Sequence, residues 1–172
     1  MNYQRETHGI TKCQLLRIFG SEVNKDLLIA FLNDLFRGRK TIQDLVYNKN
    51  EHVGEAEELG TVIFDLTCTA DNGEKFIIEV QRTALMNLKR RMLYYGSKLI
   101  ADQAPKGKRR EWNYDITEVY VIVLMDGFAM PDDEDGTNFL HDICLCNRDT
   151  GKIFYEDLGF IYLEPRRALS FH

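Results

Sequence analysis

Residues 62–82 have the sequence VIFDLTCTADNGEKFIIEVQR. Two short runs, 62–69 and 75–82, are rich in β-branched and aromatic residues, which are typical of strands. Between them lie Asp71, Asn72 and Gly73, which favour a tight turn. The stretch therefore predicts a β-hairpin.

Two acids stand inside these otherwise apolar runs. Asp65 interrupts VIFDL and Glu79 interrupts FIIEV. Charged side chains are seldom placed in half-buried strands unless they are paired or bind a cation. Because side chains alternate along a strand, Glu79 and Gln81 share one face.

The type of turn decides whether the two acids meet. A two-residue turn would place Asp65 opposite Val80, with Glu79 on the other face. A type I turn over 70–73, with Gly73 in the left-handed conformation, would place Asp65 opposite Glu79. The turn residues favour the second register, which brings the two Cβ atoms to within about 5 Å of each other.

A pair of carboxylates without His or Cys is the kind of site that suits Mg²⁺ or Mn²⁺. Gln81 could position a water molecule or a phosphate oxygen, but its neutral amide cannot supply positive charge. The alternative interpretation is that Asp65 and Glu79 are edge-strand or paired acids without a chemical role. The spacing by itself leaves both interpretations open.

The rest of the chain predicts a single α/β domain over residues 1–172. The pattern of apolar residues predicts one helix at 22–37, with Ser21 as N-cap and Gly38 as its stop, and a second helix that ends before Pro105. This second helix spans 84–103. The other predicted elements are a central strand at 117–125 (TEVYVIVLM), a hairpin of strands at 138–146 and 152–163, and a short strand at 41–47.

The charges are unevenly distributed along the chain. The net charge of the 172 residues is -5, which argues against a polyanionic partner for the whole surface. Residues 82–110, however, contain nine Lys and Arg against one Asp, a local net charge of +8. This segment predicts a nucleic-acid contact, although a charged run is also typical of an ordinary solvated face.

The cysteines and the absence of an apolar leader indicate an intracellular protein. No run of about 18 apolar residues occurs, and the polar start of the chain does not resemble a secretory signal. We expect the four cysteines to be reduced and mostly buried. A zinc site at His141, Cys144 and Cys146 is disfavoured because a fourth ligand at a recognised spacing is missing.

Several motifs together resemble a known family. FDLTCTADNGEKFIIEVQR at 64–82 and RRMLYYGSKLIADQ at 90–103 resemble the motifs of the PD-(D/E)XK nuclease family transposases, which are related to recombination-promoting nucleases. FGSEVNKDLLIAFLNDLF at 19–36 is similar to the opening helix of that family. The resemblance spans most of the chain, although members of this family commonly continue beyond the last strand, so we expect a truncated C-terminus.

The resemblance implies a restriction-endonuclease-like core, with a mixed central β-sheet flanked by helices. It implies that Asp65 and Glu79 bind Mg²⁺ or Mn²⁺, and that Gln81 stands where other branches of the superfamily have a lysine. The implied activity is DNA endonuclease cleavage in recombination or transposition, by a cytoplasmic, nucleoid-associated bacterial protein. The alternative is a degenerate nuclease fold that only binds nucleic acid or another protein.

The remaining candidates would contact the substrate. Arg91 and Tyr94 could approach a phosphate from the second long helix, while Tyr95 lies in the apolar stripe and is expected in the core. Glu22 is a candidate for an additional acid, with an exposed charge at a helix start as the alternative. A homodimer is a candidate for the oligomeric state. A basic loop could hold backbone phosphates through four residues, Lys106, Lys108, Arg109 and Arg110.

Overall fold

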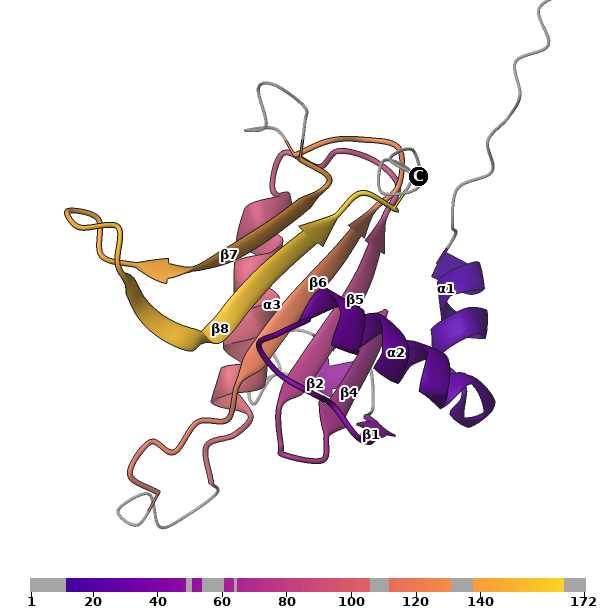
Figure 1. Ribbon diagram of the computed structural model, residues 1–172, viewed down its shortest axis with the longest axis horizontal. Helices are drawn as coiled ribbons and strands as arrows, with labels where there is room; N and C mark the ends of the chain where they lie inside the picture. Colours follow the sequence, from indigo (N-terminus) through magenta and orange to yellow (C-terminus); the bar gives the residue numbers. More distant parts are fainter. Residues whose placement is uncertain are drawn as a thin grey trace, which may run out of the picture.

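A computed structural model of the chain describes residues 12–48, 51–53, 61–63, 65–105, 112–130 and 138–165 (Figure 1). The helices are α1 (Lys12–Phe19), η1 (Glu22–Asn24, a 3-10 turn), α2 (Lys25–Leu35) and α3 (Leu88–Ala101). The strands are β1 (Leu45–Tyr47), β2 (Glu51–Val53), β3 (Thr61–Ile63), β4 (Leu66–Ala70), β5 (Lys75–Gln81), β6 (Val119–Met125), β7 (Leu140–Cys146) and β8 (Ile153–Leu163).

Six of the strands form one mixed sheet with the order β1-β4-β5-β6-β8-β7. The strands β5, β6 and β8 are parallel to one another, and the pairs β1–β4, β4–β5 and β7–β8 are antiparallel. Strands β2 and β3 pair separately as a small ribbon. The sheet confirms the mixed α/β fold that the sequence indicates, with β6 in the interior as its continuous apolar run predicts.

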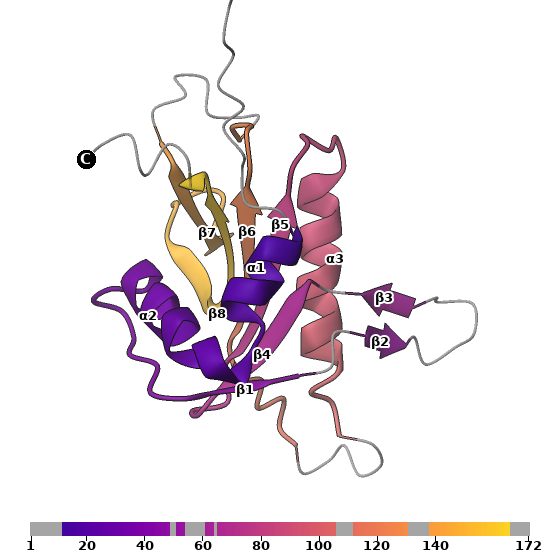
Figure 2. The same ribbon diagram turned by 90° about the vertical axis from the view of Figure 1, so that its right-hand side faces the viewer.

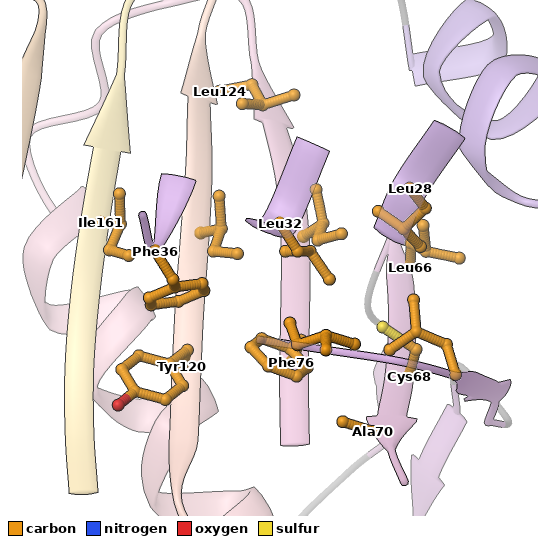
Figure 3. Packing of buried hydrophobic residues seen from close by; sticks show 14 of the residues in the cluster. Leu28, Leu32, Phe36, Leu66, Cys68, Ala70, Phe76, Tyr120, Leu124 and Ile161 are labelled. Carbon is orange, nitrogen blue, oxygen red and sulfur yellow. The ribbon is translucent and has the colours of Figure 1, made fainter. Parts of the chain in front are cut away.

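Helices cover both faces of the sheet, with α2 on one side and α3 on the other (Figure 2). On the α2 side, Phe36 packs edge-on against Tyr120, with ring centroids 4.7 Å apart, and Phe76 stacks on Tyr120 at 5.7 Å (Figure 3). On the α3 side, the apolar stripe of α3 packs against β6 and β8. α3 is the crossover between the parallel strands β5 and β6, so its position is set by the sheet.

Several predicted elements need correction at their ends. The first long helix begins at Lys25 instead of residue 22, because residues 22–24 form a 3-10 turn. Ser21 has the extended backbone of an N-cap but makes no side-chain capping hydrogen bond. The second helix spans Leu88–Ala101 and is shorter at both ends than the predicted 84–103. Helix α1 was absent from the prediction.

The predicted strand at 62–69 is wrong as a single element. It is divided into β3, which pairs with β2, and β4, which joins the main sheet just after Asp65. The expectation that most cysteines are buried is also wrong. All four are free thiols, but only Cys68 is buried, because Cys144 and Cys146 lie on the edge strand β7 and Cys13 on the exposed side of α1.

A buried ionic network ties α2 to the start of the parallel strands. The Lys40 ammonium, just after α2, contacts the carboxylates of Glu74 (2.7 Å) and Glu118, and the Tyr120 hydroxyl also donates to Glu118. Burial opposes the charged form of Lys40, but the hydrogen bonds with Glu118 and Glu74 raise its pKa above the ordinary value. The network therefore anchors the loop after α2 at the end of the sheet opposite to Gln81.

Within the described ranges, no helix is long and apolar enough to cross a membrane.

Candidate active site

The turn between β4 and β5 sets the register of the two acids. The Gly73 N–H donates to the Ala70 carbonyl (2.9 Å), the Ala70 N–H donates to the Glu74 carbonyl (2.8 Å), and Gly73 has φ 92°. This is the type I turn with a left-handed glycine, a conformation that other residues adopt only with strain. The pairing of β4 with β5, continued by one residue, places Asp65 opposite Glu79 and confirms the predicted register.

The two acids are linked through the backbone of each other's strand. The Asp65 N–H donates to Glu79 Oε1 (3.0 Å), and the Val80 N–H donates to Asp65 Oδ2 (3.0 Å). Asp65 is 5% exposed and Glu79 0% exposed. Burial of a carboxylate is costly unless hydrogen bonds and opposite charge compensate for it. The two side chains are therefore held in place before any ligand arrives.

Gln81 and Arg91 meet at the other oxygen of Glu79. The Gln81 side-chain amide donates to Glu79 Oε2 (3.4 Å), and Arg91 Nη2 lies 3.5 Å from the same oxygen. Gln81 comes from the same strand as Glu79, two residues along, whereas Arg91 reaches the sheet from α3. The acids, the amide and the guanidinium thus gather on the face of the sheet that α3 covers.

These residues fit a small divalent cation of the magnesium type. Mg²⁺ is commonly held by one or two carboxylates and keeps several water or phosphate ligands, so a pair such as Asp65 and Glu79 is sufficient. The described part of the chain contains no group of three or more His, Cys, Asp or Glu that could hold a metal ion. An ion here would therefore take its remaining ligands from water, the Gln81 amide oxygen or a substrate phosphate.

Asp126 is a neighbour that the sequence analysis missed. It follows β6 directly, its N–H donates to the Gln81 carbonyl (2.8 Å), and its carboxylate lies 3.8 Å from Arg82 Nε. Asp126 is 8% exposed. The signal in the sequence that points to Asp126 is an acid immediately after a wholly apolar strand. The carboxyl ends of parallel strands meet at one edge of a sheet, so such an acid lies near the end of the neighbouring strand.

Tyr95 is also more than a core residue. It is buried, at 8% exposure, as its place in the apolar stripe predicts. Its hydroxyl, however, accepts a hydrogen bond from Arg91 Nε at 2.7 Å. The interpretation of Tyr95 as core alone was therefore incomplete, because residues four apart on a helix lie side by side.

The other candidate residues have varied positions. Tyr94 is 43% exposed, and Lys98 Nζ lies 5.6 Å from the centroid of its ring. Glu22 has a 70% exposed side chain whose ion pair is with Lys25 at 3.7 Å, so it is a surface charge at a helix start. The four basic loop residues, Lys106, Lys108, Arg109 and Arg110, lie outside the described residues.

The comparison with family models decides the family. Residues 15–169 match the model of the PD-(D/E)XK nuclease family transposases. The chain belongs to this family. The resemblance seen in its motifs is thereby confirmed over nearly the whole chain, and the six-stranded mixed sheet agrees with the fold of the family. No curated protein and no solved structure gives a significant match.

Membership of this transposase family supports a function related to nuclease or transposase activity. PD-(D/E)XK nucleases generally use divalent metals, and the nuclease family implies a DNA substrate.

Proposed function

We propose that this PD-(D/E)XK transposase-family protein is a metal-dependent DNA endonuclease that acts in recombination or transposition. The observation that carries the proposal is the register of β4 and β5, which places the buried carboxylates of Asp65 and Glu79 opposite each other with Gln81 beside them. A turn of the other type would separate the two acids.

Asp65 and Glu79 would hold Mg²⁺ or Mn²⁺, and Gln81 would position the attacking water or a phosphate oxygen through its amide. A divalent ion bound there would supply a nucleophilic water of lowered pKa and neutralise charge that develops on the phosphodiester. The backbone hydrogen bonds of the two acids would keep this geometry fixed, so that little reorganisation is needed when DNA binds.

Substrate contacts are assigned to the basic side of the site. Arg91 lies at the site, Tyr94 is exposed on the same helix, and Lys106, Lys108, Arg109 and Arg110 follow that helix in the sequence. Contacts of this kind bind backbone phosphates without reading bases, so we expect salt-sensitive binding. Glu22 stays a candidate for an additional acid; its side chain is exposed and pairs with Lys25.

Plasmid cleavage by isosteric variants tests the nuclease assignment. Supercoiled plasmid is incubated with wild type, Asp65→Asn or Glu79→Gln, each with Mg²⁺, Mn²⁺ or EDTA. Because Asn and Gln can still accept the backbone N–H bonds, both variants should remain folded, as circular dichroism would show. We expect nicking or linearisation by metal-loaded wild type and a loss of roughly 10³-fold or more in each variant.

The matched control is Asp34→Asn, which neutralises an exposed acid of α2 that pairs with Arg37. It should cleave like wild type. Cleavage that survives both site substitutions would refute the assignment of the site. If folded wild type binds the plasmid with and without metal but never cuts it, the protein is a binding module on a degenerate nuclease fold.

We also propose that two copies associate through β7. This strand is at the edge of the sheet, its sequence LHDICLC has no Lys, Arg or Pro to discourage pairing, and Leu140, Ile143 and Leu145 are about 40% exposed. Antiparallel self-pairing centred on Ile143 would set Asp142 opposite Cys144 of the other copy, so like charges would not meet. Light scattering should show a wild-type dimer and an Ile143→Lys monomer, and a wild-type monomer would exclude this arrangement.

A further inference from the structure

The site has an unusual source of positive charge for its buried acid. The residue two positions after Glu79 is Gln81, whose amide is neutral. Among the described residues, Arg91 brings a cationic group to Glu79 from α3, with its Nη2 3.5 Å from Glu79 Oε2. Glu79 is fully buried and the Arg91 side chain is 33% exposed, so the guanidinium spans from the buried carboxylate towards solvent.

Tyr95 fixes the orientation of that guanidinium. Its hydroxyl accepts the Arg91 Nε–H at 2.7 Å, and the guanidinium carbon is 5.1 Å from the centroid of its ring. The ring itself is buried in the cluster between α3 and the sheet. Since Tyr95 is immobilised by packing, it restrains Arg91 without using the Nη2 group that faces Glu79.

We propose that Arg91 exchanges partners during the reaction, with Tyr95 as the positioning residue that makes the exchange possible. Arg91 balances the charge of Glu79 while no divalent cation is bound. Once Glu79 binds a cation, Arg91 is released to contact the scissile phosphate, and its hydrogen bond to Tyr95 keeps it within reach. Arg91 thus supplies, from the helix, the positive charge that Gln81 cannot supply from the strand.

This inference rests on the proposed nuclease function and makes a prediction that cleavage alone does not test. Arg91 competes with a divalent cation for Glu79, so its removal should strengthen metal binding although it weakens catalysis. A purely structural ion pair would have the opposite effect, because its loss would loosen Glu79 and weaken metal binding. The affinity for the metal and the rate of cleavage therefore have to be measured on the same variants.

Mn²⁺ binding by calorimetry and cleavage kinetics would be compared for wild type, Arg91→Gln and Arg91→Lys. We expect Arg91→Gln to bind Mn²⁺ on the order of threefold to tenfold more tightly, the range of a partly exposed ion pair. Its kcat should fall by roughly 10²-fold, as for the loss of one transition-state donor. Arg91→Lys should recover part of kcat. The control Arg37→Gln, which removes the exposed ion pair between Arg37 and Asp34 at the end of α2, should change neither quantity.

Tyr95→Phe separates positioning from packing, since it deletes the hydroxyl but keeps the ring. We expect kcat to fall by roughly 10- to 100-fold, the worth of one hydrogen bond to a charged group, with KM nearly unchanged. Tyr162→Phe, a buried tyrosine of the same cluster, should leave kcat at the wild-type value. Equal effects of the two substitutions on kcat would overturn the positioning role of Tyr95.

Two outcomes distinguish the failure of this inference from failure of the proposed function. Unchanged or weaker Mn²⁺ binding by Arg91→Gln, with an active wild type, would overturn the exchange of partners alone. A folded wild type that neither binds Mn²⁺ nor cleaves plasmid would overturn both proposals.

Discussion

Replacement of Lys40 by methionine should destabilise the protein far more than its position in a loop suggests. The side chains of Lys40 and Glu74 are 13% and 6% exposed, and Glu74 Oε2 is buried without a hydrogen-bond partner in the described residues. Lys40→Met therefore leaves Glu74 with no compensating charge. Breaking a buried pair from one side costs about 3–5 kcal/mol, which for a chain of this size lowers Tm by roughly 6–20 °C.

Urea denaturation of three variants would test this magnitude. Lys40→Met should show the full loss, and Lys40→Met with Glu74→Gln should recover a large part of it, because the uncompensated charge is then removed. The control Lys25→Met breaks the Lys25–Asp44 pair of 2.8 Å, in which Asp44 is 60% exposed, and should cost much less. If Lys40→Met costs no more than Lys25→Met, the buried network is not a source of stability.

The same network predicts a defined dependence of stability on pH. Burial raises the pKa of Glu118, but its hydrogen bonds with Lys40 and Tyr120 outweigh burial and lower the pKa below its ordinary 4.5. The contribution of Glu118 is therefore complete above pH 4.5 and is lost as the pH falls through the folded value. The contribution of Lys40 to stability is complete below its ordinary pKa of 10.5 and is lost as the pH rises through its raised folded pKa. The difference between wild type and Lys40→Met should shrink below the lower limit and above the upper one.

Two further predictions concern packing and thiol reactivity. A Cβ on Gly159 would lie 2.7 Å from the Tyr120 ring, so Gly159→Ala should lower the free energy of unfolding by about 1–3 kcal/mol in urea denaturation. The control is Gly96→Ala in α3, whose Cβ would lie at an ordinary 3.5 Å from its neighbours and which should leave this free energy unchanged or raise it. Equal losses in the two variants would contradict the prediction. Burial raises the pKa of the Cys68 thiol to about 12, so a thiol reagent should modify exposed Cys146 in the folded protein and Cys68 only after unfolding, as peptide mass spectrometry would show.

Local patterns were sufficient to predict the pairing of the two acids and the central place of β6. The register of β4 and β5 depends on the four turn residues 70–73, and these are contiguous in the sequence, so the choice between two turns could be made from their types alone. Likewise, the apolar run of β6 predicted its central place. The division of 62–69 into β3 and β4 was not predictable in this way, because the whole segment is rich in strand-forming residues.

What the sequence could not predict depends on contacts between distant segments. Lys40 contacts Glu74 and Glu118, which are 34 and 78 residues away, and nothing in the spacing of these residues joins them. The role of Tyr95 depends in the same way on how α3 is rotated over the sheet. The periodicity of the helix shows that Tyr95 faces the core and lies beside Arg91, four residues away, but only the packed sheet shows that this pair meets Glu79. The stripe that buries the helix therefore also orients the cation of the site, so a substitution at Tyr95 has to be judged by both catalysis and stability.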